Sequence, residues 1–166
     1  MPEMDLEAFE SLFREYQGDV YGWILRIVRD PAAAEDLTLE TFWRIWKARA
    51  RFDPSRSFAP WARRIASNLA LGYLRRRPID APLLFEPAAP PAPDPAVRRE
   101  TSEKVARAFR ELPPKLQVAA TLALIEEQKY EYIAAGLGIS VGGVKSRVFR
   151  AVRVLRRKLE RMGIEP

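Results

Sequence analysis

A run of small, polar and basic side chains between Tyr130 and Arg150 has the spacing of a helix-turn-helix. Ala134 is a small residue at the point where two helices would cross. Gly138 allows the left-handed turn between them, and Val144 would make the apolar contact that joins the helices. The second helix would place polar side chains against the base edges and phosphates of the DNA major groove. These side chains are Ser140, which is also placed to cap the helix, Lys145, Ser146, Arg147 and Arg150. An ordinary helical hairpin is the alternative.

A second basic segment spans residues 42–77, which carry ten basic side chains and one acidic side chain, Asp53. Aromatic residues are interleaved with the arginines, and aromatic faces suit stacking with unpaired bases. Helical spacing places Trp46, Phe58, Trp61 and Tyr73 on apolar stripes, however, so core packing is the alternative for these rings. The loop at 49–57 therefore offers the better base-contact candidates. They are Arg49, Arg51, Phe52, Asp53, Ser55 and Arg56.

Acidic residues gather at Glu35, Asp36 and Glu40, near the start of an expected helix. One interpretation is a carboxylate metal site, and the other is acidic side chains favoured by the helix dipole. The carboxylate pattern of metal-binding helical bundles also uses histidine, and the chain contains no histidine and no cysteine. We therefore predict no metal and no catalytic site, because disulfides, zinc-thiolate sites, cysteine nucleophiles and Ser-His-Asp triads are also excluded.

The helical pattern divides into two halves separated by a proline-rich segment. Seven of the 14 prolines lie between Pro78 and Pro95, which predicts a stiff, extended linker. Apolar residues recur every three or four positions on both sides, and no strand-like alternation is present. The expected fold is all-α, with two small helical domains, residues 1–77 and 97–166, joined by a linker at 78–96. The net charge of +6 comes from two basic segments, which suggests a polyanion contacted at two places, although solvated helix faces would give the same charge.

Five stretches carry a resemblance to a known family. They read FESLFREYQGDVYGWILRIVRD, AEDLTLETFWRIWKA, FDPSRSFAPWARRIASNLALGYLRRR, FRELPPKLQVAATLALIEE and YEYIAAGLGISVGGVKSRVFRAVRVLRRKL. They follow in this order and cover nearly all of residues 6–161. The chain resembles an extracytoplasmic-function sigma factor of bacterial RNA polymerase, in the sigma-70 family. Leu39 and Gly72 depart from the family pattern, which usually has glutamine and often has aspartate at these positions.

The resemblance implies that residues 1–77 bind core polymerase and open the promoter, and that residues 97–166 read the minus-thirty-five element with the helix at 140–150. The minus-ten element would be gripped by a loop and the helix that follows it. The residues implied to contact the minus-ten element are Arg49, Arg51, Phe52, Asp53, Arg56, Arg63, Arg64 and Asn68. The clamp helices of the polymerase β′ subunit would be met by an earlier helix. The residues implied to contact the polymerase are Asp36, Leu37, Glu40, Phe42, Trp43 and Trp46.

The implied partners are core RNA polymerase at its β′ clamp helices and β flap, double- and single-stranded promoter DNA, and an anti-sigma factor. The implied protein is not an enzyme and needs no cofactor. We expect it to be cytoplasmic without stable membrane insertion, because residues 1–10 are acidic and no apolar run approaches the ~20 residues of a membrane span. One rival is a helix-turn-helix repressor or activator, which would explain only residues 127–161. The other is a nucleic-acid-processing enzyme.

Each domain is small for an independent hydrophobic core. Two marginal domains would gain from packing together when free, whereas a working factor must reach two separated DNA elements. We therefore expect a compact resting form, with Leu83, Leu84 and Phe85 of the linker as the adhesive. A freely mobile tether is the alternative.

Overall fold

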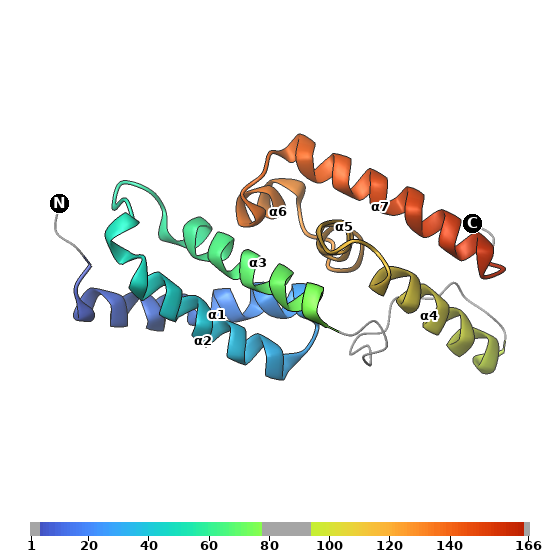
Figure 1. The fold of residues 1–166 in the computed structure, drawn as a ribbon, viewed down its shortest axis with the longest axis horizontal. Helices are drawn as coiled ribbons and strands as arrows, with labels where there is room; N and C mark the ends of the chain where they lie inside the picture. The colour runs from blue at the N-terminus through green and yellow to red at the C-terminus, as the bar shows by residue number, and fades with distance from the viewer. Residues whose placement is uncertain (1–3, 78–93, 165–166) are drawn as a thin grey trace.

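The computed structural model describes residues 4–77 and 94–164 of the chain (Figure 1). These parts contain helices, turns and no strand, so the all-α prediction is confirmed for them. In chain order the helices are α1 (Leu6–Val28), α2 (Pro31–Lys47), α3 (Phe58–Arg76), α4 (Pro95–Arg110), α5 (Pro114–Ala120), α6 (Tyr130–Leu137) and α7 (Val141–Arg161). A 3-10 turn, η1 (Arg49–Arg51), follows α2, and a π-helical turn, η2 (Thr121–Ile125), follows α5.

Aspartate followed by proline starts two of these helices. The Asp30 carboxylate accepts hydrogen bonds from the backbone amides of Ala32 and Ala33, and Pro31 takes the first position of α2. Asp94 accepts from the amide of Ala96 at 2.8 Å in the same way, with Pro95 as the first residue of α4. The linker prediction is therefore too long at its end, because residues 95 and 96 are helical.

The first three helices pack around a shared apolar interior. α1, α2 and α3 each contact the other two, and α2 lies antiparallel to α1 in the ribbon (Figure 1). Edge-to-face ring contacts link the helices, as between Phe13 and Phe42, whose centroids lie 4.9 Å apart. The fully buried interior includes Val20, Trp23, Ile24, Ala34, Ile45, Ala62 and Ala66.

The helix-turn-helix forms as its spacing predicts. Gly138 ends α6 in the left-handed conformation, at φ 70°, where a residue without Cβ carries no steric cost. The Ser140 hydroxyl caps α7 by accepting from the amide of Gly143 at 3.0 Å. Val144, fully buried, packs α7 against α6. α4 closes the outer end of α7, and Lys158 of α7 donates to Glu111 at 3.1 Å.

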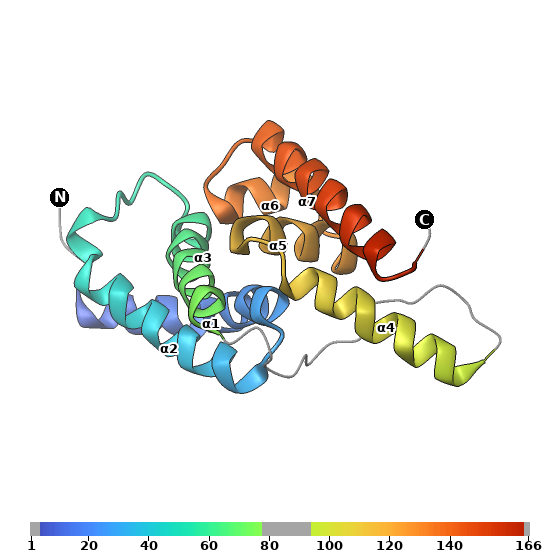
Figure 2. The same cartoon turned by 45° about the vertical axis from the view of Figure 1, so that its right-hand side comes forward.

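One of two buried apolar clusters is shared by the two halves of the chain, and the other lies within the second half. Val118, Leu122, Ile133 and Val144 from the second half belong to the same buried cluster as the interior of α1–α3. α6 and α5 both pack against α3, as Figure 2 shows from the side. The described chain is therefore compact, in agreement with the expected resting form. The predicted adhesive, residues 83–85, lies outside the described residues.

Candidate nucleic-acid interface

One face of α7 is buried and the opposite face is basic. Val148, Ala151 and Leu155 are buried toward α4, α5 and α6. Because successive helix residues are 100° apart, the side chains on the far side point into solvent. Among the predicted residues, Lys145, Ser146 and Arg150 are exposed there. This face has the shape and charge that enter a DNA major groove.

Two of the predicted minus-thirty-five residues hold other positions. Arg147 is only half-exposed, beside the buried stripe of α7. Ser140 is exposed, but its hydroxyl is engaged as the helix cap. Phe149, which the sequence reasoning missed, is 63% exposed and lies on the outward face with Arg153, whose guanidinium is 5.9 Å from its ring. An exposed phenylalanine on this face offers an apolar contact to a thymine methyl group.

The loop after α2 is held by its own side chains. The Arg49 guanidinium stacks 3.8 Å from the Trp46 ring centre and donates to the Trp46 carbonyl at 2.8 Å. The Phe52 ring lies 5.0 Å from Trp61 and 5.7 Å from Phe58, so this candidate base contact packs toward the core. Arg51 remains exposed at the tip.

Asp53 shapes the loop instead of pointing freely into solvent. Its carboxylate accepts hydrogen bonds from the Ser55 hydroxyl at 2.7 Å and from the Ser55 amide at 2.9 Å. These bonds hold the pKa of Asp53 below its usual value, because both stabilise the charged form. The neighbouring Arg56 is 81% exposed and presents its charge to any ligand of the loop.

α3 carries the remaining three predicted minus-ten residues. Arg64 and Asn68 are exposed on one side of the helix. Arg63, by contrast, is only 13% exposed, with its Nε 3.2 Å from the Asp19 carboxylate and its guanidinium 4.8 Å from the Tyr132 ring centre. Arg63 is thus occupied by partners from both halves of the chain.

The exposed face of α2 carries acidic, apolar and basic side chains, among them Lys47, whose ammonium lies 5.3 Å from the Trp43 ring centre. Asp36 and Trp43 point outward, Trp43 being 53% exposed. Leu39, another residue that the sequence reasoning left out, is 58% exposed and lies one turn from each of them. One member of the predicted polymerase-contact set, Phe42, lies in the interior. Phe42 is 3% exposed and packs on Phe13, so it holds the helix in place and has no free surface to offer.

The other predicted members of this set lie at the margins of the face. Leu37 is half-buried against the core, and Trp46 makes an edge-to-face contact with the Phe9 ring, with the ring centroids 5.1 Å apart. Glu40 forms an ion pair with Arg44, one turn along the helix, at 3.2 Å.

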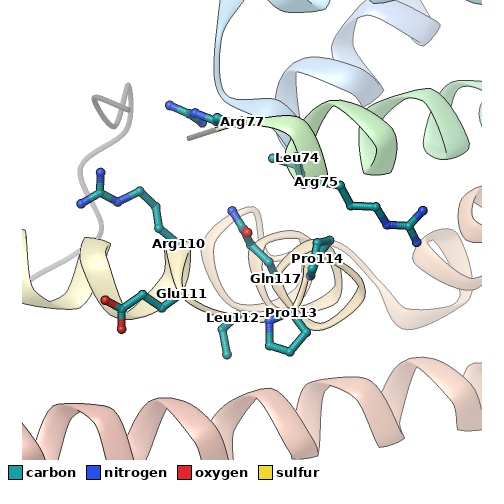
Figure 3. A pocket seen from close by; sticks show the side chains of 9 residues that line it. All are labelled: Leu74, Arg75, Arg77, Arg110, Glu111, Leu112, Pro113, Pro114 and Gln117. Carbon is teal, nitrogen blue, oxygen red and sulfur yellow. The ribbon is translucent and has the colours of Figure 1, made fainter. Parts of the chain in front are cut away.

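No cluster of carboxylates in residues 4–77 and 94–164 has an arrangement that could hold a metal ion. No helix in these same ranges is both long and apolar enough to cross a membrane. A cavity of about 400 Å³ lies where the end of α3 meets α4 and α5. Arg75 and Arg77 line it, but their guanidinium groups extend in opposite directions and do not converge on a single anion (Figure 3).

Comparison with known proteins connects these surfaces to a family. The family model "Sigma-70 region 2" matches residues 12–78, and the model "Sigma-70, region 4" matches residues 102–155. The chain is 36% identical to RNA polymerase sigma factor CarQ of Myxococcus xanthus, over 96% of this chain and 93% of that protein. Other relatives, at 29–34% identity, are named ECF RNA polymerase sigma factors. The chain belongs to the sigma-70 family, in its extracytoplasmic-function group.

Solved structures share the fold of this sigma factor. CnrH, solved in complex with the cytosolic domain of CnrY, has a TM-score of 0.57 at 25% identity, covering 94% of this chain and 90% of that one. The sigma factor RpoE, solved with the anti-sigma factor NepR from Bartonella quintana, has a TM-score of 0.53 at 22% identity. That likeness covers 93% of this chain and 98% of the other and concerns the fold alone.

Family membership makes core RNA polymerase and promoter DNA the partners of this sigma factor, and transcription initiation its role. The α1–α3 bundle corresponds to region 2, and the helix-turn-helix lies in region 4. Helical spacing was the signal that could have found Leu39 and Phe149, since each lies one turn from a predicted residue on the exposed face of its helix.

Proposed function

We propose that this sigma factor reads the minus-thirty-five element with the exposed face of α7 and opens the minus-ten element with the loop at 49–57 and α3. The main support for the proposal is that α7 has one buried face and, opposite it, one exposed polar face. Lys145, Ser146, Phe149 and Arg150 are exposed, and the residues opposite them hold the helix in a capped helix-turn-helix. Arginine and serine donate to base edges and phosphates, and phenylalanine contacts the thymine methyl group.

In region 2, Arg51, Arg56, Arg64 and Asn68 supply exposed polar groups for the opened strand. Edge-to-face and tilted ring contacts among Phe52, Phe58 and Trp61 support the loop on its core side. The chain contributes sequence specificity in the cytoplasm, and the polymerase performs the chemistry.

The polymerase contact is assigned to the outer face of α2, at Asp36, Leu39 and Trp43. An exposed apolar pair beside carboxylates suits a protein surface that carries both basic and apolar side chains. The Asp36 carboxylate repels DNA phosphates, which favours a protein partner at its end of the face. Region 4 makes the second contact, with the β flap.

An anti-sigma factor regulates the protein by covering these surfaces. The support is that two structural neighbours are solved bound to regulatory or partner proteins: CnrH with CnrY, and RpoE with the anti-sigma factor NepR. Masking the polymerase face or the DNA face would prevent initiation.

Run-off transcription with core polymerase and a cognate promoter tests the assignment of α7. Replacing Arg150→Ala should reduce promoter-specific transcript by about tenfold, since one base-edge contact is worth ~1–3 kcal/mol. Arg161→Ala is the matched control, because it lies on the same helix roughly 16 Å further along. Equal transcript from Arg150→Ala and the control would overturn the DNA assignment.

The polymerase face is tested in parallel by affinity for core polymerase. Asp36→Arg should weaken binding, because it reverses the charge at one end of the proposed contact. Glu35→Arg makes the same charge change on an adjacent exposed residue that points about 100° away. If both variants bind core polymerase as the wild-type chain does, the outer face of α2 is not the contact.

A further inference from the structure

The exposed face of α7 continues as a row of arginines beyond the residues assigned to base reading. Because successive helix residues are 100° apart, Ser146, Arg150, Arg153 and Arg157 fall within about 60° of the helix circumference. All four side chains are exposed. They form a row about 16 Å long on the side of α7 opposite its buried stripe.

The arginines in this row are not neutralised by neighbouring acids. Between residues 140 and 161 the chain has eight basic side chains and one acidic side chain, Glu160. The Arg153 guanidinium contacts the Phe149 ring, 5.9 Å from its centre. Within residues 4–77 and 94–164, neither Arg153 nor Arg157 forms an ion pair. The outer side of α7 therefore carries a concentrated positive charge.

The neighbouring helix α4 shows how a solvent-facing helix of this chain balances its charge. Lys104 pairs with Glu100 at 3.0 Å, and Arg107 pairs with Glu111 at 3.2 Å, each one turn away. Glu111 also pairs with Lys158, which is the one basic residue of α7 with an ion pair among the described residues. The outer row of α7 lacks this internal compensation, so its charge suits a polyanion outside the chain.

The row is longer than the groove that its first half would occupy. The DNA major groove is about 12 Å wide and winds around the duplex, whereas an α-helix runs straight. Arg153 and Arg157 lie roughly 5 and 10 Å further along the axis than Arg150. When Ser146 and Arg150 face base edges, these two side chains approach the edge of the groove, where the phosphates lie. Guanidinium groups bind phosphate oxygens through paired hydrogen bonds.

We propose that Arg153 and Arg157 bind the DNA phosphate backbone beside the bases that α7 reads. The inference rests on the proposed function, because it takes α7 as the helix that enters the groove. Arg153 and Arg157 supply affinity that does not depend on DNA sequence, and Ser146, Phe149 and Arg150 supply the preference for particular bases. The continuity of the row with these base-reading residues favours DNA over an acidic protein surface.

Two charge-removing substitutions test the contact. Arg153→Gln and Arg157→Gln each remove one positive charge and keep a polar side chain of similar helix propensity. Arg99→Gln is the matched control, because Arg99 is exposed on α4, which packs on the buried side of α7. None of the three residues belongs to the buried core, so far-UV circular dichroism should show equal helix content in all variants.

The first measurement is the salt dependence of DNA binding by the full-length chain. Fluorescence anisotropy with a short labelled duplex of mixed sequence gives the association constant between about 50 and 200 mM KCl. Each substitution in the row should make the slope of log K against log salt shallower by about 0.9, and the double variant by about 1.8. Arg99→Gln should keep the wild-type slope. If the double variant also keeps it, the row does not bind phosphates and the proposal fails, as it would if an acidic protein were the partner.

The second measurement separates phosphate contacts from base contacts. In run-off transcription with core polymerase, the double variant should lose transcript by the same factor on a cognate promoter and on one with an altered minus-thirty-five element. A changed ratio between the two promoters would assign the arginines to base edges and overturn the proposal.

The two proposals can fail separately, because the slope is measured on a duplex of mixed sequence. A shallower slope in the double variant, together with unchanged transcript from Arg150→Ala, would refute the proposed base reading and leave the phosphate contact supported.

Discussion

Replacing Gly138 tests how the recognition helix is held in place. Gly138 has φ 70°, a conformation that costs a residue with a Cβ roughly 1–2 kcal/mol. The new methyl group would also meet the Arg64 side chain at 3.2 Å, but that side chain is flexible and exposed and can move. Gly138→Ala should therefore lower the free energy of unfolding by about 1–2 kcal/mol. For a chain of this length, that corresponds to a Tm lower by about 2–8 °C.

Thermal unfolding followed by circular dichroism measures the effect, with two variants for comparison. Gly138→Asn should recover part of the loss, because asparagine tolerates the left-handed conformation. Gly142→Ala, in the first turns of α7, meets no atom closer than 3.8 Å and should be neutral or stabilising. If Gly138→Ala unfolds at the wild-type temperature, the turn does not require glycine. If alanine and asparagine cost the same, crowding and not backbone conformation is the cause.

Two further substitutions test local stability. Gly72→Ala in α3 should raise the free energy of unfolding by about 1 kcal/mol, because its Cβ would meet only the movable Arg76 guanidinium at 3.2 Å. A lower Tm would contradict this. Lys158 and Arg107 hold the pKa of Glu111 below its usual value. Their stabilisation is present above the ordinary glutamate pKa of about 4.3 and is lost as pH falls through the lower folded pKa. Glu111→Gln should therefore unfold with less dependence on pH in that acid range than the wild-type chain.

The helix-turn-helix was predictable from sequence because its determinants are local. The cap at Ser140, the left-handed turn at Gly138 and the buried Val144 all act within a dozen residues of one another. The aspartate–proline start of α2 is equally local. Such signals depend on backbone geometry and helical periodicity, which the residue types themselves express.

A resemblance assigns the polymerase-contact residues to a helix and not to a face of that helix. Phe42 and Trp43 are neighbours in the sequence, yet one is 3% and the other 53% exposed. The 100° step between them turns one into the core and the other into solvent. Which side of α2 faces the core depends on where α1 and α3 lie. Two adjacent aromatic residues in the sequence do not indicate that side.

The contact between the two regions was the least predictable feature, since its partners meet only in the folded chain. Ser67 and Gly136 are 69 residues apart, and neither is distinctive by itself. General reasoning about two small cores predicted compactness but assigned the adhesion to residues 83–85. In the described structure, Trp23, Ser67 and Gly136 form a buried contact between the regions, and a serine and a glycine leave little trace in a hydrophobic pattern.

The forces at this contact differ from those that bind DNA. An ion pair between Arg29 and Glu126 spans the two regions, with the two side chains 25% and 20% exposed. Burial of Trp23, Ile133 and Leu122 in the shared core adds apolar adhesion. Apolar burial is insensitive to moderate salt, whereas contacts between arginine and phosphate weaken steeply as salt rises. Rising salt should therefore weaken DNA binding while leaving the packing between the two regions intact.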